Sequence, residues 1–176
     1  MSRYCYLVTV SPSSPIPLVL IGCFHEAQID ASASRYEGAR ISFRQALESI
    51  IDQHGIRLIG EEIEASKPSI ARGIAERRNL RYLNIDIPED CRKWVKHRPP
   101  RLFNEVTQRF DDLLLSDEYA KAWNLVREYH MYESALEGLR ESPEPSLLIV
   151  GKLHVEPLAA MGFPTWFRVT KLSFDG

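Results

Sequence analysis

The chain carries Leu18-Val19-Leu20-Ile21-Gly22-Cys23-Phe24-His25 near its start and Leu147-Leu148-Ile149-Val150-Gly151-Lys152-Leu153-His154 near its end. Both stretches are short apolar runs that close on the pattern Gly-x-x-His. An apolar run of this length that ends at a glycine is typical of a strand buried inside a sheet. Ligands bind at the carboxyl ends of strands in open α/β sheets. The two stretches therefore predict a site to which each contributes an imidazole.

Further short apolar runs alternate with segments of helical periodicity, which predicts an α/β fold with a mainly parallel sheet flanked by helices. We expect strands over 4–10, 16–23, 56–60, 82–87, 146–150 and 166–172. We expect helices over 41–54, 70–75, 102–115, 117–141 and 155–161. Residues 66–69 supply a cap for the second helix, and Gly55 stops the first. Residues 101–141 form a helical insertion before the last Gly-x-x-His strand, within one domain over residues 1–176.

The composition is that of an ordinary globular protein. Of the 176 residues, 44% are hydrophobic and 26% are charged, and the formal net charge is -2. Bulk charge therefore gives no attraction to nucleic acid. A basic stretch at residues 92–101 surrounds Pro99 and Pro100, but no RNA- or DNA-binding motif accompanies it. We interpret it as a solvated loop and do not expect a nucleic-acid partner.

The sequence contains neither a membrane span nor an export signal that we recognise. The apolar stretch over 16–23 is far too short to cross a bilayer. The start Met1-Ser2-Arg3-Tyr4 lacks the apolar core and the small-residue cleavage site of a signal peptide. Three cysteines, Cys5, Cys23 and Cys91, are an odd number without CxxC spacing, which argues against disulfides and a cysteine zinc site. We expect reduced thiols and a cytoplasmic protein that does not bind membranes.

Polar side chains follow several of the expected strands. They are His25, Glu61 or Glu62, Asp86 and His154. In a parallel sheet all of them emerge at one edge, where two imidazoles and a carboxylate suit a divalent metal with open positions, or general acid and base catalysis. The simpler alternative is that loops are polar, and Asp86 shortly before Pro88 also suits a turn. A nucleophilic pair of Cys23 and His25 is disfavoured, because close neighbours at a strand end rarely point to one place.

Arg127 is a further candidate, on the helix expected over 117–141. Trp123, Val126 and His130 mark the expected apolar face of that helix, and Arg127 lies at its edge. A guanidinium there needs a carboxylate or an anionic substrate group, because an unpaired buried charge is costly. Arg127 therefore either serves the site or pairs with an acid such as Glu128 for structure alone.

Five elements in this order give the chain a resemblance to a known superfamily. They are Gly22-Cys23-Phe24-His25, Glu61-Glu62, Asp86, Arg127-Glu128-Tyr129-His130-Met131 and Gly151-Lys152-Leu153-His154. The set resembles the Tiki/TraB/erythromycin-esterase/ChaN-like superfamily, which is marked by paired Gly-x-x-His elements, a strand-end acid and an Arg-x-x-x-Met stretch. The resemblance covers residues 18–154.

The resemblance implies an α/β core with a helical insertion between its halves and a cleft at the paired elements. Characterised members include metal-dependent peptidases and esterases that open a macrolide ring, and others bind haem. The implied metal ligands are His25, His154 and Glu62, the implied catalytic residues are Glu61, Glu62 and Arg127, and the implied substrate contacts are Arg127, Asp86 and Glu26. This chain departs from the pattern in having two adjacent glutamates and in being much shorter, so neither substrate carries over.

The leading hypothesis is a small cytoplasmic hydrolase that acts on a small-molecule or peptide-like substrate. A divalent ion, Mn²⁺, Co²⁺ or Zn²⁺, is the expected cofactor, because such ions activate water at neutral pH. The alternative is a binding or sensor module that captures an anionic small molecule or haem without reaction.

Overall fold

The structure is a computed structural model that describes residues 14–30, 34–89 and 117–175. Its strands are β1 (Ile16–Cys23), β2 (Leu58–Glu61), β3 (Arg81–Asn84), β4 (Ser146–Gly151) and β5 (Phe167–Ser173). Its helices are α1 (His25–Gln28), α2 (Glu37–His54), α3 (Ile70–Arg78), α6 (Asp117–Glu141) and α7 (Val155–Ala160), with 3₁₀ turns η1 (Ser34–Tyr36) and η4 (Lys152–His154). The strand expected over 4–10, the helix expected over 102–115 and the basic stretch at 92–101 lie outside the described residues.

The strands form one sheet in the order β3-β2-β4-β1-β5, and each neighbouring pair is parallel. The expected α/β fold with a parallel sheet is confirmed. β4 is the central strand, with Gly151 in register with Cys23 of β1 and Ile149 in register with Glu61 of β2. The two Gly-x-x-His strands are therefore direct neighbours, and the strand that carries the acid pair lies on the other side of β4.

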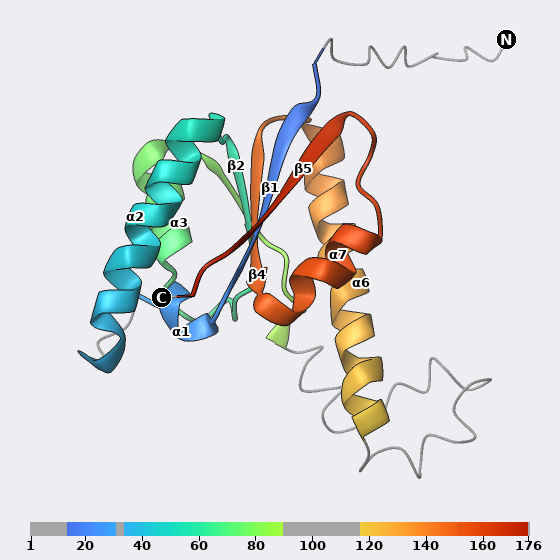
Figure 1. Cartoon of the computed structure of the whole chain (residues 1–176), viewed down its shortest axis with the longest axis horizontal. Helices are drawn as coiled ribbons and strands as arrows, with labels where there is room; N and C mark the ends of the chain where they lie inside the picture. Colours follow the sequence, from blue (N-terminus) through green and yellow to red (C-terminus); the bar gives the residue numbers. More distant parts are fainter. Residues whose placement is uncertain (1–13, 31–33, 90–116, 176) are drawn as a thin grey trace, which may run out of the picture.

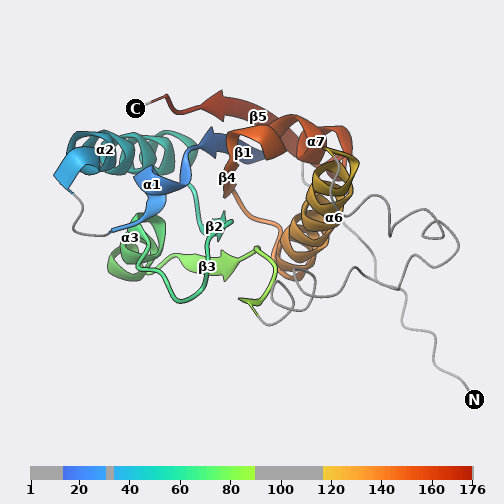
Figure 2. The same ribbon diagram turned by 90° about the horizontal axis from the view of Figure 1, so that it is seen from below.

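Helices cover both faces of this sheet in a three-layer arrangement (Figures 1 and 2). α2 and α3 lie on one face and connect β1 to β2 and β2 to β3. α6 and α7 lie on the other face and connect β3 to β4 and β4 to β5. The connections that leave β1 and β2 thus run to one face, whereas the connection that leaves β4 runs to the other. In such a doubly wound sheet the ligand crevice lies outside the carboxyl ends of the strands at this switch point.

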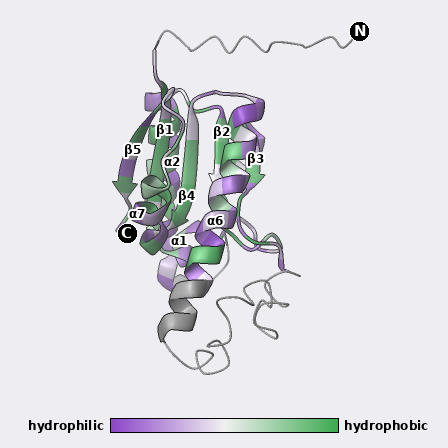
Figure 3. Cartoon of the chain, turned by 90° about the vertical axis from the view of Figure 1, so that its right-hand side faces the viewer, coloured by the Kyte–Doolittle hydropathy of each residue, from purple (hydrophilic) through white to green (hydrophobic). Residues whose placement is uncertain are grey.

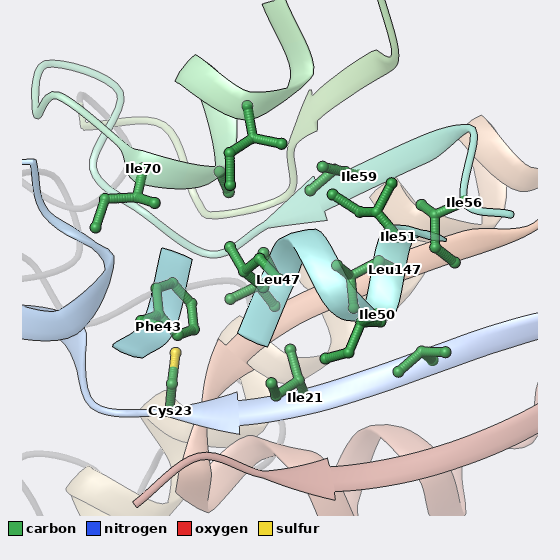
Figure 4. Packing of buried hydrophobic residues seen from close by; sticks show 14 of the residues in the cluster. Ile21, Cys23, Phe43, Leu47, Ile50, Ile51, Ile56, Ile59, Ile70 and Leu147 are labelled. Atoms are coloured by element: carbon green, nitrogen blue, oxygen red, sulfur yellow. The ribbon is translucent and has the colours of Figure 1, made fainter. Parts of the chain in front are cut away.

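Apolar side chains alternate between the two faces and build a core on each. Val19 and Ile21 of β1 pack toward α2 and α3, while Leu18 and Leu20 pack toward α6 and α7. Figure 4 shows the first of these cores, in which Phe43 of α2 lies beside Cys23. Figure 3 shows mostly hydrophobic strands and an α6 with hydrophilic segments on its outward surface. Burial of the strands on both faces explains their continuous apolar runs.

The helix boundaries follow the sequence signals. α2 ends at Gly55, which adopts a left-handed conformation with φ 61° that suits glycine. α3 begins after Ser69, whose hydroxyl accepts a hydrogen bond from the backbone N–H of Arg72 at 3.0 Å. The third strand is shorter than expected: it ends at Asn84, so Asp86 lies in the turn that follows.

The expected apolar face of α6 is wrong. The line that faces the sheet consists of Glu128, Met131, Ala135 and Leu139, which are all buried. Trp123, Val126 and His130 are only half-buried. Because the buried line contains a charged Glu and a small Ala, its sequence is not strongly hydrophobic. Hydrophobic periodicity therefore indicates the neighbouring face of the helix. Because α6 packs on the sheet, the described part of the expected insertion is a layer of the core.

Among the residues that the structure describes, no helix combines the length and the apolar character needed to span a membrane.

Candidate functional site

Four loops at the carboxyl edge of the sheet, together with α6, deliver the candidate residues. His25 opens α1 directly after β1, Glu62 follows β2, Asp86 follows β3, and His154 closes η4 after β4. Figure 1 shows α1 and the start of α7 at this same edge. Arg127 reaches the edge from α6. The parallel direction of the strands therefore brings together side chains that are far apart in the sequence.

The carboxylate of Glu62 is the centre of the group and is fully buried. Its Oε1 pairs with Nη2 of Arg127, and its Oε2 accepts a hydrogen bond from the backbone N–H of Gly151 at 2.7 Å. Nε2 of His154 lies 3.6 Å from Oε1, and Nε2 of His25 lies 4.0 Å from the same atom. Both imidazoles thus face one carboxylate oxygen.

Arg127 joins two carboxylates. Its Nη2 pairs with Glu62 and also lies 3.4 Å from Oδ1 of Asp86. Asp86 is itself fixed by a hydrogen bond from the backbone N–H of Ile87 to Oδ1 at 2.8 Å. Because its charge is already shared by two acids, Arg127 orients Glu62 rather than offering a free cation.

The two histidines have different surroundings. The side chain of His25 is 51% exposed, whereas that of His154 is 7% exposed. Nδ1 of His154 lies 2.8 Å from Oε1 of Glu128, which is buried on α6. Sequence reasoning considered Glu128 only as a structural partner for Arg127 and missed this contact. The sequence contained one signal for the burial of Glu128: it precedes Met131 by three positions and therefore shares its helical face.

Gly151 leaves open the space that these groups surround. A Cβ atom built on Gly151 would lie 3.5 Å from Nε2 of His25, 3.5 Å from Oε2 of Glu62 and 3.4 Å from Cδ2 of His154. The point above the Gly151 Cα is therefore in contact distance of all three side chains. A side chain at position 151 would therefore place its Cβ in van der Waals contact with all three groups.

Glu61 is not brought to the histidines. It points to the opposite face of the sheet, since consecutive residues of a strand point to opposite faces. There its Oε2 accepts hydrogen bonds from the hydroxyl of Ser69 and, at 2.7 Å, from that of Tyr82. Burial raises the pKa of Glu61. The geometry therefore assigns the candidate role to Glu62 and gives Glu61 no contact with the site.

Two other candidates also lie apart from the group. Glu26 is exposed on α1, and none of the described site residues is bonded to it. Cys23 is buried against the α2 and α3 core, where its Sγ accepts a hydrogen bond from Nε2 of Gln28 at 2.9 Å. Burial raises the pKa of the Cys23 thiol to about 12. A thiol held protonated in the core is not a nucleophile, so a pair with His25 gains no support.

The donor set suits a divalent cation in its chemistry. Among the residues that the structure describes here, the three carboxylates of Glu62, Asp86 and Glu128 outnumber the one guanidinium, and two imidazoles face them. Imidazole and carboxylate are ligands that Zn²⁺, Mn²⁺ and Co²⁺ accept. Within the described ranges, however, no three His, Cys, Asp or Glu side chains are already grouped as a metal site. Two ligand atoms of one tetrahedral metal lie about 3.4 Å apart. This separation is slightly shorter than the distances from the two imidazole Nε2 atoms to Oε1 of Glu62.

Comparisons of the chain with protein-family models, with curated proteins and with solved structures found no match. The resemblance to the Tiki/TraB/erythromycin-esterase/ChaN-like superfamily consequently rests on the five sequence elements alone.

Proposed function

We propose that this protein is a small hydrolase whose site lies outside the carboxyl ends of β1, β2 and β4. One observation carries the proposal: two imidazoles face the same oxygen of the buried Glu62, around a space kept open by Gly151. Hydrolysis needs a group that takes a proton from water and a group that returns one to the leaving atom. An imidazole oriented by a carboxylate can perform both tasks in turn, because it takes the proton from water and then gives it to the leaving atom.

His25 performs both tasks because of its surroundings. Its side chain is half exposed, so a water can reach Nε2 and give up a proton there. Glu62 orients this imidazole and stabilises its positive charge after the transfer. His154 is enclosed, and its Nε2 faces the same oxygen of Glu62, so His25 gives the proton that it took from water to the leaving group. Arg127 and the Gly151 N–H hold the carboxylate of Glu62 in place.

A divalent metal belongs to the proposal as a cofactor. If it is bound, His25, His154 and Glu62 would hold it, and it would supply a Lewis acid that activates water in place of the proton transfer at His25 and polarises a carbonyl or phosphoryl oxygen. The excess of carboxylates in the site supports this version, because a cation offsets it. The same excess does not favour an anionic ligand, so the binding-module alternative gains no support from the charges.

The setting of the proposed hydrolase follows from its sequence. We propose a cytoplasmic enzyme for a small-molecule or peptide-like substrate, related to the Tiki/TraB/erythromycin-esterase/ChaN-like superfamily through its five shared elements. We propose no nucleic-acid partner.

Hydrolysis of a probe panel tests the proposal. The panel contains p-nitrophenyl acetate, p-nitrophenyl phosphate and a fluorogenic dipeptide amide, each offered with Mn²⁺, Co²⁺ or Zn²⁺ and with a chelator. We expect turnover of one class by the wild type and a loss of at least about 100-fold in His25→Ala and Glu62→Gln, the scale of an acid–base contribution. Gly151→Ala is expected to stay folded and to lose turnover, because its Cβ fills the site.

His54→Ala is the matched control, since His54 is in the last turn of α2 at the opposite edge of the sheet. It should keep full turnover. Full turnover of the wild type in the chelated sample would refute the metal and leave acid–base catalysis by His25 and Glu62. Turnover that survives in both His25→Ala and Glu62→Gln would refute the hydrolase site itself.

A further inference from the structure

We propose that Glu128 is a positioning residue of this site, which fixes the ring of His154 so that Nε2 points at Glu62. The proposal rests on the proposed function of the same site. Its geometric basis is the contact of 2.8 Å between Oε1 of Glu128 and Nδ1 of His154, on the side of the ring away from Glu62.

The contact determines which nitrogen of His154 carries the proton. A carboxylate only accepts hydrogen bonds, so Nδ1 must be the donor. The neutral ring then has its free lone pair at Nε2, which lies 3.6 Å from Oε1 of Glu62. A carboxylate behind an imidazole also makes the opposite nitrogen a better ligand and base. Glu128 therefore prepares the nitrogen that faces the site.

Burial makes this control effective. Glu128 is 8% exposed and His154 is 5% exposed, so water does not compete for Nδ1. Glu128 also belongs to the line of α6 residues that packs on the sheet, next to Met131 and Ala135 in the helical repeat. Its position is thus set by the core. His25 differs, because among the described residues no hydrogen bond holds its exposed ring.

A simpler explanation is that the pair only ties α6 to η4. That role needs only the Nδ1–H, and an amide oxygen at position 128 would serve it as well. The positioning role also requires that the carboxylate of Glu128 controls the character of Nε2. The tautomer of His154 and the Zn²⁺ affinity in Glu128→Gln therefore separate the two explanations.

Long-range ¹H–¹⁵N spectra of the metal-free full chain measure this tautomer directly. The His154 signals are identified by their loss in His154→Gln. We expect a protonated-type shift for Nδ1 and an unprotonated-type shift for Nε2 in the wild type. Glu128→Gln should give mixed or reversed tautomers, because an amide both donates and accepts. Glu133→Gln, an exposed acid on the same helix, is the matched control and should match the wild type.

Zn²⁺ titration of the same proteins gives a second readout. We expect Glu128→Gln to weaken Zn²⁺ binding by about 10–100-fold, as for other partners of ligating histidines. Glu128→Asp retains a carboxylate on a shorter side chain, so its Zn²⁺ affinity should lie between those of the wild type and Glu128→Gln. If Glu128→Gln does not fold, Glu128→Asp takes its place in the comparison. Glu133→Gln should bind like the wild type.

The outcomes distinguish this inference from the proposed function. A wild type with Nε2 protonated, alone or together with Nδ1, overturns the positioning role. A tautomer and a Zn²⁺ affinity that are unchanged in Glu128→Gln overturn it as well. A wild type with the expected tautomer but without Zn²⁺ binding upholds Glu128 and refutes the metal of the proposed function.

Discussion

Glu61 and Glu62 are consecutive buried acids with opposite surroundings. Glu62 is bonded to a guanidinium and a backbone N–H and faces two imidazoles. Within the described part of the chain, the hydrogen-bond donors to Glu61 are the hydroxyls of Ser69 and Tyr82. Hydroxyl donors offset less of the desolvation cost of an ionised carboxylate than a paired cation does. One position along the chain therefore separates the acid of the site from a core acid whose pKa is raised by burial.

The raised pKa of Glu61 predicts a pH-dependent stability. Between the ordinary value of 4.5 and the raised folded value, the folded state retains a proton that the unfolded state has lost. The free energy of unfolding therefore falls as the pH rises above 4.5, by at most about 1.4 kcal/mol per pH unit from this group. In Glu61→Gln this loss should be absent. The free energy of unfolding, measured by urea at pH values from 4.5 to 8, should therefore fall less steeply with pH than that of the wild type.

The control for this experiment is Glu76→Gln, an exposed acid on α3. It should follow the wild-type curve. If the free energies of unfolding of the wild type and Glu61→Gln changed equally with pH from 4.5 to 8, the raised pKa of Glu61 would be contradicted.

At the scale of elements, β1 and the segment after β4 approach closely at Gly22. A Cβ atom at Gly22 would lie 2.6 Å from Cγ2 of Val155 and 3.1 Å from the Cα of Lys152. The glycines of the two Gly-x-x-His elements thus have different structural roles. Gly22 lets η4 and α7 settle on β1, whereas Gly151 keeps the site open.

We expect Gly22→Ala to lower the free energy of unfolding by about 1–3 kcal/mol, the usual cost of overpacking. The backbone of Lys152 and the stiff Val155 side chain leave the added methyl little room. Gly38→Ala is the control, since a Cβ there meets nothing within 4 Å, and an alanine in α2 should add up to about 1 kcal/mol. Equal urea midpoints for the two variants would contradict the close approach.

At the scale of the whole molecule, the two cores share one sheet. β1 and β4 contribute side chains to both, and α6 is anchored on the second core through Met131 and Leu139. The site lies where the connections on the two faces diverge. Its residues come from both halves of the chain, so the site is assembled only when the whole sheet forms.

We therefore expect Leu47→Ala on one face and Leu139→Ala on the other to act on the same transition. Both side chains are almost completely buried, and each truncation should cost about 2–5 kcal/mol. Far-UV circular dichroism and tryptophan fluorescence should report one coincident unfolding curve in each variant. A separate early transition in Leu139→Ala would show that α6 is an independent insertion instead of a layer of the core.

Most of the fold was predictable from the sequence because its signals are local. Buried parallel strands read as continuous apolar runs, α2 ends at a left-handed glycine, and Ser69 caps α3. The buried face of α6 was not predictable. Its selection depends on which side of the helix meets the sheet, and Glu128 is buried there because His154 is opposite.

The sequence by itself determined the class of sheet and the edge at which His25, Glu62, Asp86 and His154 emerge, because strand direction and period follow from local patterns. Only the tertiary structure decided which of two adjacent glutamates faces the histidines, that Arg127 bridges two acids, and that Glu128 stands behind His154. These choices depend on strand order and on the rotation of α6 about its axis. Both are set by packing between distant segments, which no local pattern encodes.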